Sequence, residues 1–214
     1  MRRFIVGIAL FSCVGAVRAV DLPARSVHHE AAIPAGDPVA LRLSVGELIV
    51  ESAAVDAVTV DIEARCREGA GDKCRRRLQD IRTEASINDA GASIRIVGFR
   101  KRAHHMEVEA KVVVPESSPL AVKMYAGEVQ VGGGGQSLDI RLKFGDVTVH
   151  QPLAATRSVF ADAKVGDAEV YAATGEPEPH RPFLVGSEVT WDEGEGDADV
   201  AVNLAIGSAT VYLE

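Results

Sequence analysis

The sequence predicts an all-β protein, a single-domain β-solenoid or β-helix-like repeat with coils of about 20 residues. Apolar and polar residues alternate within short segments, which is the period of a β-strand. A glycine recurs at one fixed place in these segments. Aromatic residues make up only 5% of the chain while 20 of 214 residues are glycine, which is typical of thin β layers with many turns. The hydrophobic content of 47% excludes global disorder.

The repeat consists of five segments that align on a glycine. Apolar residues precede this glycine at positions −7, −5, −3 and −1 and follow it at +2 and +4. Because −1 and +2 are an odd number of positions apart, the inside–outside alternation reverses across the glycine, as at a corner or bulge. We therefore expect five structural corner glycines: Gly46, Gly127, Gly145, Gly166 and Gly207, with a weaker copy at Gly186.

Two architectures fit such a repeat. In a β-solenoid each coil buries its apolar face against its neighbours. An antiparallel β-sandwich also alternates, and it remains the alternative. The reversal at one fixed position favours the solenoid.

The N-terminal residues 1–19 have the pattern of a secretory signal peptide. Arg2 and Arg3 precede an apolar stretch at 4–17, which is too short to span a bilayer, and Ala19 precedes the expected cleavage site. Lipoprotein processing at Cys13 is a minor alternative. Cleavage removes three arginines and no acid, so the net charge changes from −8 to −11.

The mature chain divides into an N-terminal segment, 20–38, and a β-repeat domain, 39–214. Within this domain residues 51–115 lack the corner glycine and form an atypical β-rich part, as terminal elements of repeat proteins often do. Alternation predicts strands at 58–64, 93–96 and 106–112. Residues 74–81 are expected to form one or two helical turns. The loop 174–182 interrupts the array before Gly186.

The cysteines agree with export. Cys66 and Cys74 remain after cleavage, an even number in an oxidising compartment, and a short glycine-containing loop separates them. We predict a structural disulfide between them. A redox pair would need the Cys-x-x-Cys spacing, and a zinc site would need two further ligands nearby.

The run Val112-Val-Val-Pro115-Glu, then Pro119-Leu120, then the Gly127, Gly145 and Gly166 units resembles the bacterial "putative adhesin" domain family. The resemblance covers about residues 40–214. It implies an exported, non-enzymatic β-solenoid of the cell envelope, and some relatives are linked to envelope-stress signalling or surface attachment. That family has no established catalytic residues, so none is carried over.

Acidic residues give two candidate cation sites. Glu47, Glu128, Asp146 and Asp167 follow the corner glycines, and coils stacked in register would place the last three in one column. Residues 192–199 carry five acids, which a calcium ion would favour. In both cases we expect side chains that point into solvent, with cation binding as the alternative.

No residue pattern indicates catalysis or a cofactor. Residues 132–135 are four glycines before a strand, so we expect a turn rather than a phosphate-binding loop, which precedes a helix. The histidines, His28, His29, His104, His105, His150 and His180, match no nucleophile or metal motif. We expect no enzyme activity, cofactor or metal site.

The sequence therefore predicts an exported, non-enzymatic cell-envelope protein that acts as an adhesin-like binding or scaffolding domain. A periplasmic component of envelope-stress sensing and a carbohydrate-active β-helix enzyme are the alternatives. The expected partner is an envelope protein or a surface glycan. The acidic balance argues against nucleic acid, and no second apolar stretch is long enough for a transmembrane helix. The expected location is the periplasm or envelope.

Overall fold

A computed structural model describes residues 22–98, 105–173, 177, 179–180 and 185–214 of the chain. The all-β class is confirmed: these residues form one mixed 11-stranded sheet, which is not closed. The predicted signal peptide and Cys13 lie outside the described residues. Within them, no helix is long and apolar enough to cross a membrane.

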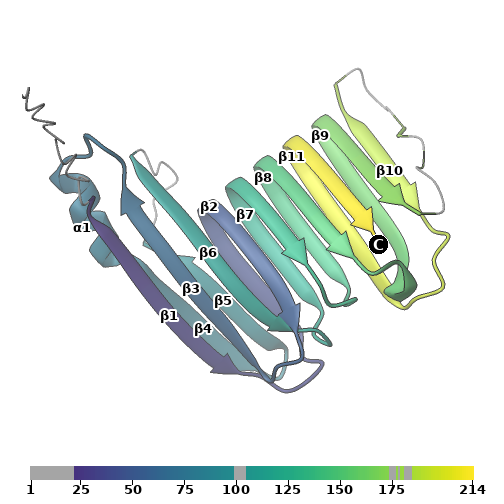
Figure 1. Cartoon of the computed structure of the whole chain (residues 1–214), viewed down its shortest axis with the longest axis horizontal. Coiled ribbons are helices and arrows are strands. Elements are labelled where there is room, and N and C mark those ends of the chain that lie inside the picture. The colour runs from purple at the N-terminus through teal and green to yellow at the C-terminus, as the bar shows by residue number, and fades with distance from the viewer. Residues whose placement is uncertain (1–21, 99–104, 174–176, 178, 181–184) are drawn as a thin grey trace, which may run out of the picture.

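Five long parallel strands form the centre of the molecule. They lie side by side in the order β2 (Val39–Ala53), β7 (Leu120–Gly132), β8 (Leu138–Gln151), β11 (Ala198–Leu213) and β9 (Thr156–Ala172). Each strand folds over at its glycine, so that the halves before the glycines form a first layer and the halves after them a second layer (Figure 1). The apolar side chains between the layers form the core.

Burial follows the predicted reversal, with one correction. Residues at −7, −5 and −3 and at +2 and +4 are buried in all five strands. The residue at −1, expected to point inward, does not: Val165 and Ile206 are 42% and 45% exposed. The chain crosses from one layer to the other at this point, so the corner begins before the glycine and turns the −1 side chain outward.

The corner glycines have a backbone conformation that other residues rarely adopt, with φ between 126° and 139°. They also lie against the neighbouring backbone. A Cβ on Gly145 would lie 1.8 Å from the carbonyl oxygen of Gly127, and a Cβ on Gly127 would lie equally close to that of Gly46. The space of each missing side chain is therefore occupied by the adjacent strand.

The long strands do not lie side by side in chain order. Strand β11 lies between β8 and β9 and pairs in parallel with both. Gly186 precedes β10 (Ser187–Trp191), which pairs antiparallel with β9, so it does not begin a further parallel coil. The repeat pattern determines the register of a strand but is the same in every copy, so it does not determine which copies become neighbours.

The atypical part 51–115 replaces one bent coil by two strands. β5 (Gly91–Val97) pairs with the first half of β2, and β6 (Met106–Pro115) pairs with the second half. β4 (Arg82–Asn88) extends the first layer, and β3 (Ala57–Cys66) and β1 (Ala24–Ala32) extend the second, all antiparallel. The expected strands and the helix at 74–81 are present here, whereas β1 and β4 were not anticipated.

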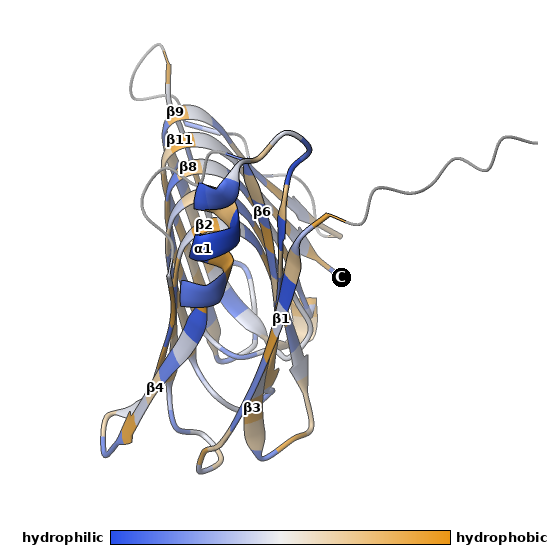
Figure 2. Cartoon of the chain, turned by 90° about the vertical axis from the view of Figure 1, so that its left-hand side faces the viewer, coloured by the Kyte–Doolittle hydropathy of each residue, from blue (hydrophilic) through white to orange (hydrophobic). Residues whose placement is uncertain are grey.

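The two ends of the molecule differ. At one end α1 (Asp72–Asp80) lies between the layers and buries Cys74 and Leu78, while its outer face is hydrophilic (Figure 2). A disulfide joins Cys74 to Cys66 at the end of β3, with the two Cα atoms 6.0 Å apart. A 3-10 turn, η1 (Leu153–Ala155), connects β8 to β9. Towards the other end, the Trp191 side chain of β10 is buried in the core.

Replacing Gly145 by alanine should lower the free energy of unfolding by about 2–4 kcal/mol, because the new Cβ meets backbone and the φ is positive. The matched control is Gly132→Ala: a Cβ at Gly132 meets no atom within 4 Å. Urea unfolding of both variants measures the difference. Equal stability of the two variants would contradict the corner geometry.

Removing the disulfide by the double substitution Cys66→Ala and Cys74→Ala should cost about 2–3 kcal/mol, since the bridge closes a short loop in the unfolded chain. Urea unfolding with and without reductant checks this value, and reductant should leave the variant unaffected. A native, exported protein with two titratable thiols would show that the bridge does not form.

Candidate binding surface

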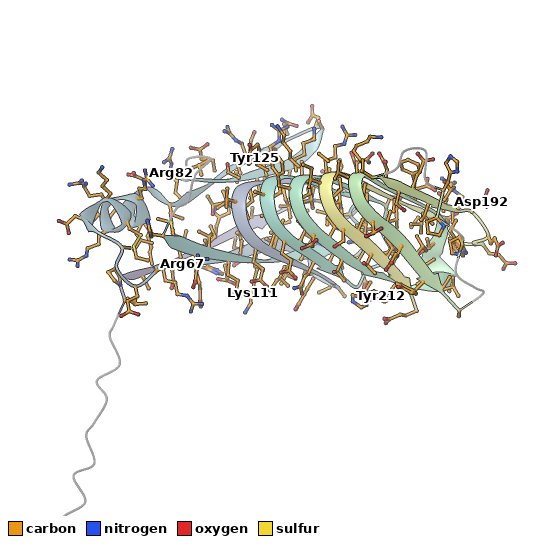
Figure 3. The ribbon with its side chains drawn as sticks, turned by 90° about the horizontal axis from the view of Figure 1, so that it is seen from above. Arg67, Arg82, Lys111, Tyr125, Asp192 and Tyr212 are labelled. Atoms are coloured by element: carbon orange, nitrogen blue, oxygen red, sulfur yellow. A yellow bond between two sulfur atoms is a disulfide. The ribbon has the colours of Figure 1, made fainter. Side chains whose placement is uncertain are left out.

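The strand alternation produces two outer faces. The first-layer face carries the residues at −6, −4 and −2 of the long strands together with β5 and β4. The second-layer face carries the residues at +1, +3 and +5 together with β6, β3 and β1. Figure 3 shows the two faces on opposite sides, with Arg82 and Tyr125 on the first and Lys111 and Tyr212 on the second.

A row of four cations crosses the first-layer face. Position −4 holds a basic residue in three neighbouring strands, and β5 adds a fourth in register: Arg95, Arg42, Lys123 and Arg141. Neighbouring strands are about 4.8 Å apart, so this basic row is a regular line of positive charge. Lys143 and Lys164 follow at position −2 in β8 and β9.

The cations of this face differ in their partners. Arg141 donates two hydrogen bonds to the Asp139 carboxylate, at 3.0 and 2.9 Å, which raise the pKa of its guanidinium. Lys164 Nζ lies 2.6 Å from Asp162 Oδ2, and the hydrogen bond that the ammonium donates to this carboxylate raises the pKa of Lys164. Within the described residues, Arg42 and Lys123 make no ion pair or side-chain hydrogen bond.

A hollow of about 630 Å³ lies beside the basic row. It forms because β11 places the small residue Ala205 at position −2, between Lys143 of β8 and Lys164 of β9. Asn203 and Asp162 also line it, as does Tyr125. The Lys143 ammonium lies 5.3 Å from the centre of the Tyr125 ring, a cation–π distance.

The second-layer face is acidic, but its acids do not form the expected column. Asp146 and Asp167 are not neighbours, because Ser208 of β11 lies between them. The Ser208 N–H and hydroxyl donate hydrogen bonds to Asp146 Oδ1, at 3.1 and 2.5 Å. Glu47 and Glu128 do lie in register beside Asp146. The inserted strand therefore separates two carboxylates and gives one of them a neutral partner.

Three rings form a stack at position +5 of the second-layer face. His150 and Tyr212 are 4.9 Å apart, Tyr212 and Tyr171 are 5.2 Å apart, and their planes are nearly parallel. Because stacked rings present their faces to each other, this row stabilises strand pairing and offers its edges to solvent. It is a poor platform for a flat ligand.

The other predicted candidates are distributed over the molecule. In the acidic loop 192–199, Asp199 is the second residue of β11 and accepts hydrogen bonds from Arg157 and Ser158, which lower its pKa. Among the described residues, no three His, Cys, Asp or Glu side chains lie where they could hold a metal ion. The glycines 132–135 connect β7 to β8.

The histidines of the described residues have different partners. His28 Nδ1 lies 2.6 Å from Asp61 Oδ1, and this hydrogen bond raises the pKa of His28. His150 Nδ1 lies 3.0 Å from Glu214 Oε1. His180 forms a bridge with Glu188, and His104 lies outside the described residues.

Sequence reasoning missed the first-layer face. The signal was available, because Arg42, Lys123 and Arg141 occupy the same position in three aligned segments. The net charge concealed it, since that value adds a basic face to an acidic one.

Comparison with known proteins finds similarity to solved structures alone. No protein-family model matches the chain, and no curated protein matches it. A "putative cell adhesion protein" from Clostridium sporogenes ATCC 15579 is 11% identical, with a TM-score of 0.49 over 89% of this chain and 100% of that one. "Putative adhesin" structures from Bacteroides fragilis NCTC 9343 and Parabacteroides distasonis ATCC 8503 are 8% and 10% identical, with TM-scores of 0.31 and 0.27, each covering 89% of this chain and 97% of theirs. The second and third of these structures carry the name of the family that the sequence resembles.

The substitution Asp146→Asn should change the free energy of unfolding by less than about 0.5 kcal/mol, because the amide oxygen still accepts both bonds from Ser208. A chelator should leave the melting temperature unchanged. Thermal melts of both cases, with Asp146→Ala as the comparison that removes the acceptor, test this. Strong destabilisation by Asp146→Asn and by the chelator together would identify a cation site.

Proposed function

We propose that this protein is an exported, non-enzymatic, solenoid-like domain of the cell envelope that binds or scaffolds through its outer faces, in the manner of an adhesin. The observation that carries the proposal is the packing of the five coils. All five inward positions of every coil are buried apolar residues. The polar side chains at the outward positions of the coils therefore lie on open outer faces. Because small substrates bind in enclosed pockets, such faces suit a large surface ligand better.

Export is supported by two features. Residues 1–19 have signal-peptide character, and the disulfide between Cys66 and Cys74 suits an oxidising compartment. The proposal places the mature N-terminus at Val20, the repeat domain over 39–214, and the protein in the periplasm or envelope. Its partner is an envelope protein or a surface glycan.

The enzyme alternative receives less support from the geometry. A glycoside hydrolase needs two carboxyl groups on opposite sides of a bound sugar. The corner acids instead lie side by side along one flat face, and Asp146 is already bonded to Ser208. Envelope-stress sensing remains compatible with the same faces, if the partner is a membrane protein.

The mature protein should be retained on immobilised envelope polysaccharides, because its faces present charged side chains in regular rows. Retention is measured by biolayer interferometry, and polymer length is measured by size-exclusion chromatography before and after incubation. Binding with unchanged polymer length is the expected result.

Intact-mass measurement of the exported protein should give a chain beginning at Val20.

The alternatives give different results in the same experiment. A polymer that shortens over time indicates the enzyme. Retention on envelope membranes but on no polysaccharide indicates a membrane-protein partner and stress sensing. A mature chain that retains Met1, or one lipidated at Cys13, contradicts the export route.

A further inference from the structure

The first-layer face combines the basic row with the adjoining hollow. In this row Arg95 and Arg141 are paired with Glu84 and Asp139, whereas Arg42 and Lys123 have no carboxylate partner among the described residues. We infer that this face binds a linear polysaccharide that carries carboxylate groups, with the polymer running across the strands. The inference rests on the proposed function, since it names the ligand class of the same outer surface. It places the polymer carboxylates on the basic row and one sugar unit in the hollow above Ala205.

Electrostatics favours an anionic ligand at this place. Arg42 and Lys123 lie on neighbouring strands in register, and neither has a carboxylate partner within the described residues. Like charges directly opposite each other in a sheet destabilise the pairing. A bound anion relieves this repulsion, whereas the rest of the molecule, with its net negative charge, repels anions. The basic row is therefore the preferred contact for a negatively charged ligand.

The geometry of the row favours a polymer. Four cations on four adjacent strands span about 14 Å, with about 4.8 Å between neighbours. That spacing is close to the length of one sugar unit in an extended polysaccharide. A chain with a carboxylate on successive sugars can contact successive strands, and a single small anion cannot.

The hollow adds groups that can bond a sugar. Asn203 lines it with an amide that can bond sugar hydroxyls, and Tyr125 adds a phenol. Lys143 and Lys164 stand on either side of Ala205. Lys164 is paired with Asp162, so Lys143 is the cation of the hollow that can bind a carboxylate of the sugar.

A second copy of the chain is the competing occupant, because its acidic second-layer face could meet the basic row. Each copy carries a net charge of −8, or −11 after cleavage, and this charge opposes association between copies. Anionic membranes and DNA are the other polyanions that a basic face can attract. The experiment distinguishes all of them.

The test uses polygalacturonate and alginate as carboxylated polymers, and dextran as a neutral one. Titration calorimetry of the mature protein should detect binding to at least one carboxylated polymer and none to dextran. The double substitution Lys123→Gln and Lys143→Gln should weaken binding about tenfold or more. Raising NaCl from about 50 mM to about 500 mM should weaken it further, because these charges are exposed.

The matched control is Lys111→Gln, which removes an exposed lysine from the opposite face. It should leave affinity within about twofold of the wild type. Circular dichroism melts verify that all variants fold.

The inference is overturned if no carboxylated polymer binds, if Lys111→Gln weakens binding as much as the double variant, or if phosphatidylglycerol vesicles or DNA bind more tightly. Salt-sensitive dimers in sedimentation, lost in the double variant, would assign the face to a second copy. Binding to other envelope glycans with none to these polymers would overturn this inference and leave the proposed function intact.

Discussion

The close approach of backbones at the corner is the constraint on which the rest of the structure depends. Each corner carbonyl occupies the space that a side chain of the next glycine would need, as Gly127 does for Gly145. Two strands can meet this way only when their glycines are in register. The glycines therefore align every other position of the five coils, and because the side-chain period is two, they also assign each residue to the core or to an outer face.

This alignment turns single residues into rows. A basic residue at the same distance from the glycine in three segments becomes a line of charge, and rings at another distance become a stack. It also explains why one strand, β11, changes both outer faces. β11 carries Ser208 where its neighbours carry acids, and Ala205 where they carry lysines. The same strand therefore interrupts the acids of one face and opens the hollow of the other.

The sequence was sufficient to predict the structural features that are local and periodic. Alternation and the glycine position predicted the strands, the reversal of facing and the corners, because these depend on residues within one segment. The position of β11 between β8 and β9 could not be predicted, because segments with the same pattern compete equally for the same neighbours. The split coil formed by β5 and β6 was missed because it has no glycine to mark it. The basic row was visible only by comparing the outward positions of aligned segments, such as Lys123 with Arg141, after the inward positions had been assigned.

The insertion of β11 also has a consequence for folding. The strand comes last in the chain, yet its two neighbours, β8 and β9, precede it. Until β11 has been synthesised and moved into place, β8 and β9 each expose an unpaired parallel edge, which is prone to association with other chains. Contacts between distant segments also make folding slow. The central sheet is therefore completed by its last strand, and a chain that stops before Ala198 leaves a gap in the middle of the molecule rather than at its margin.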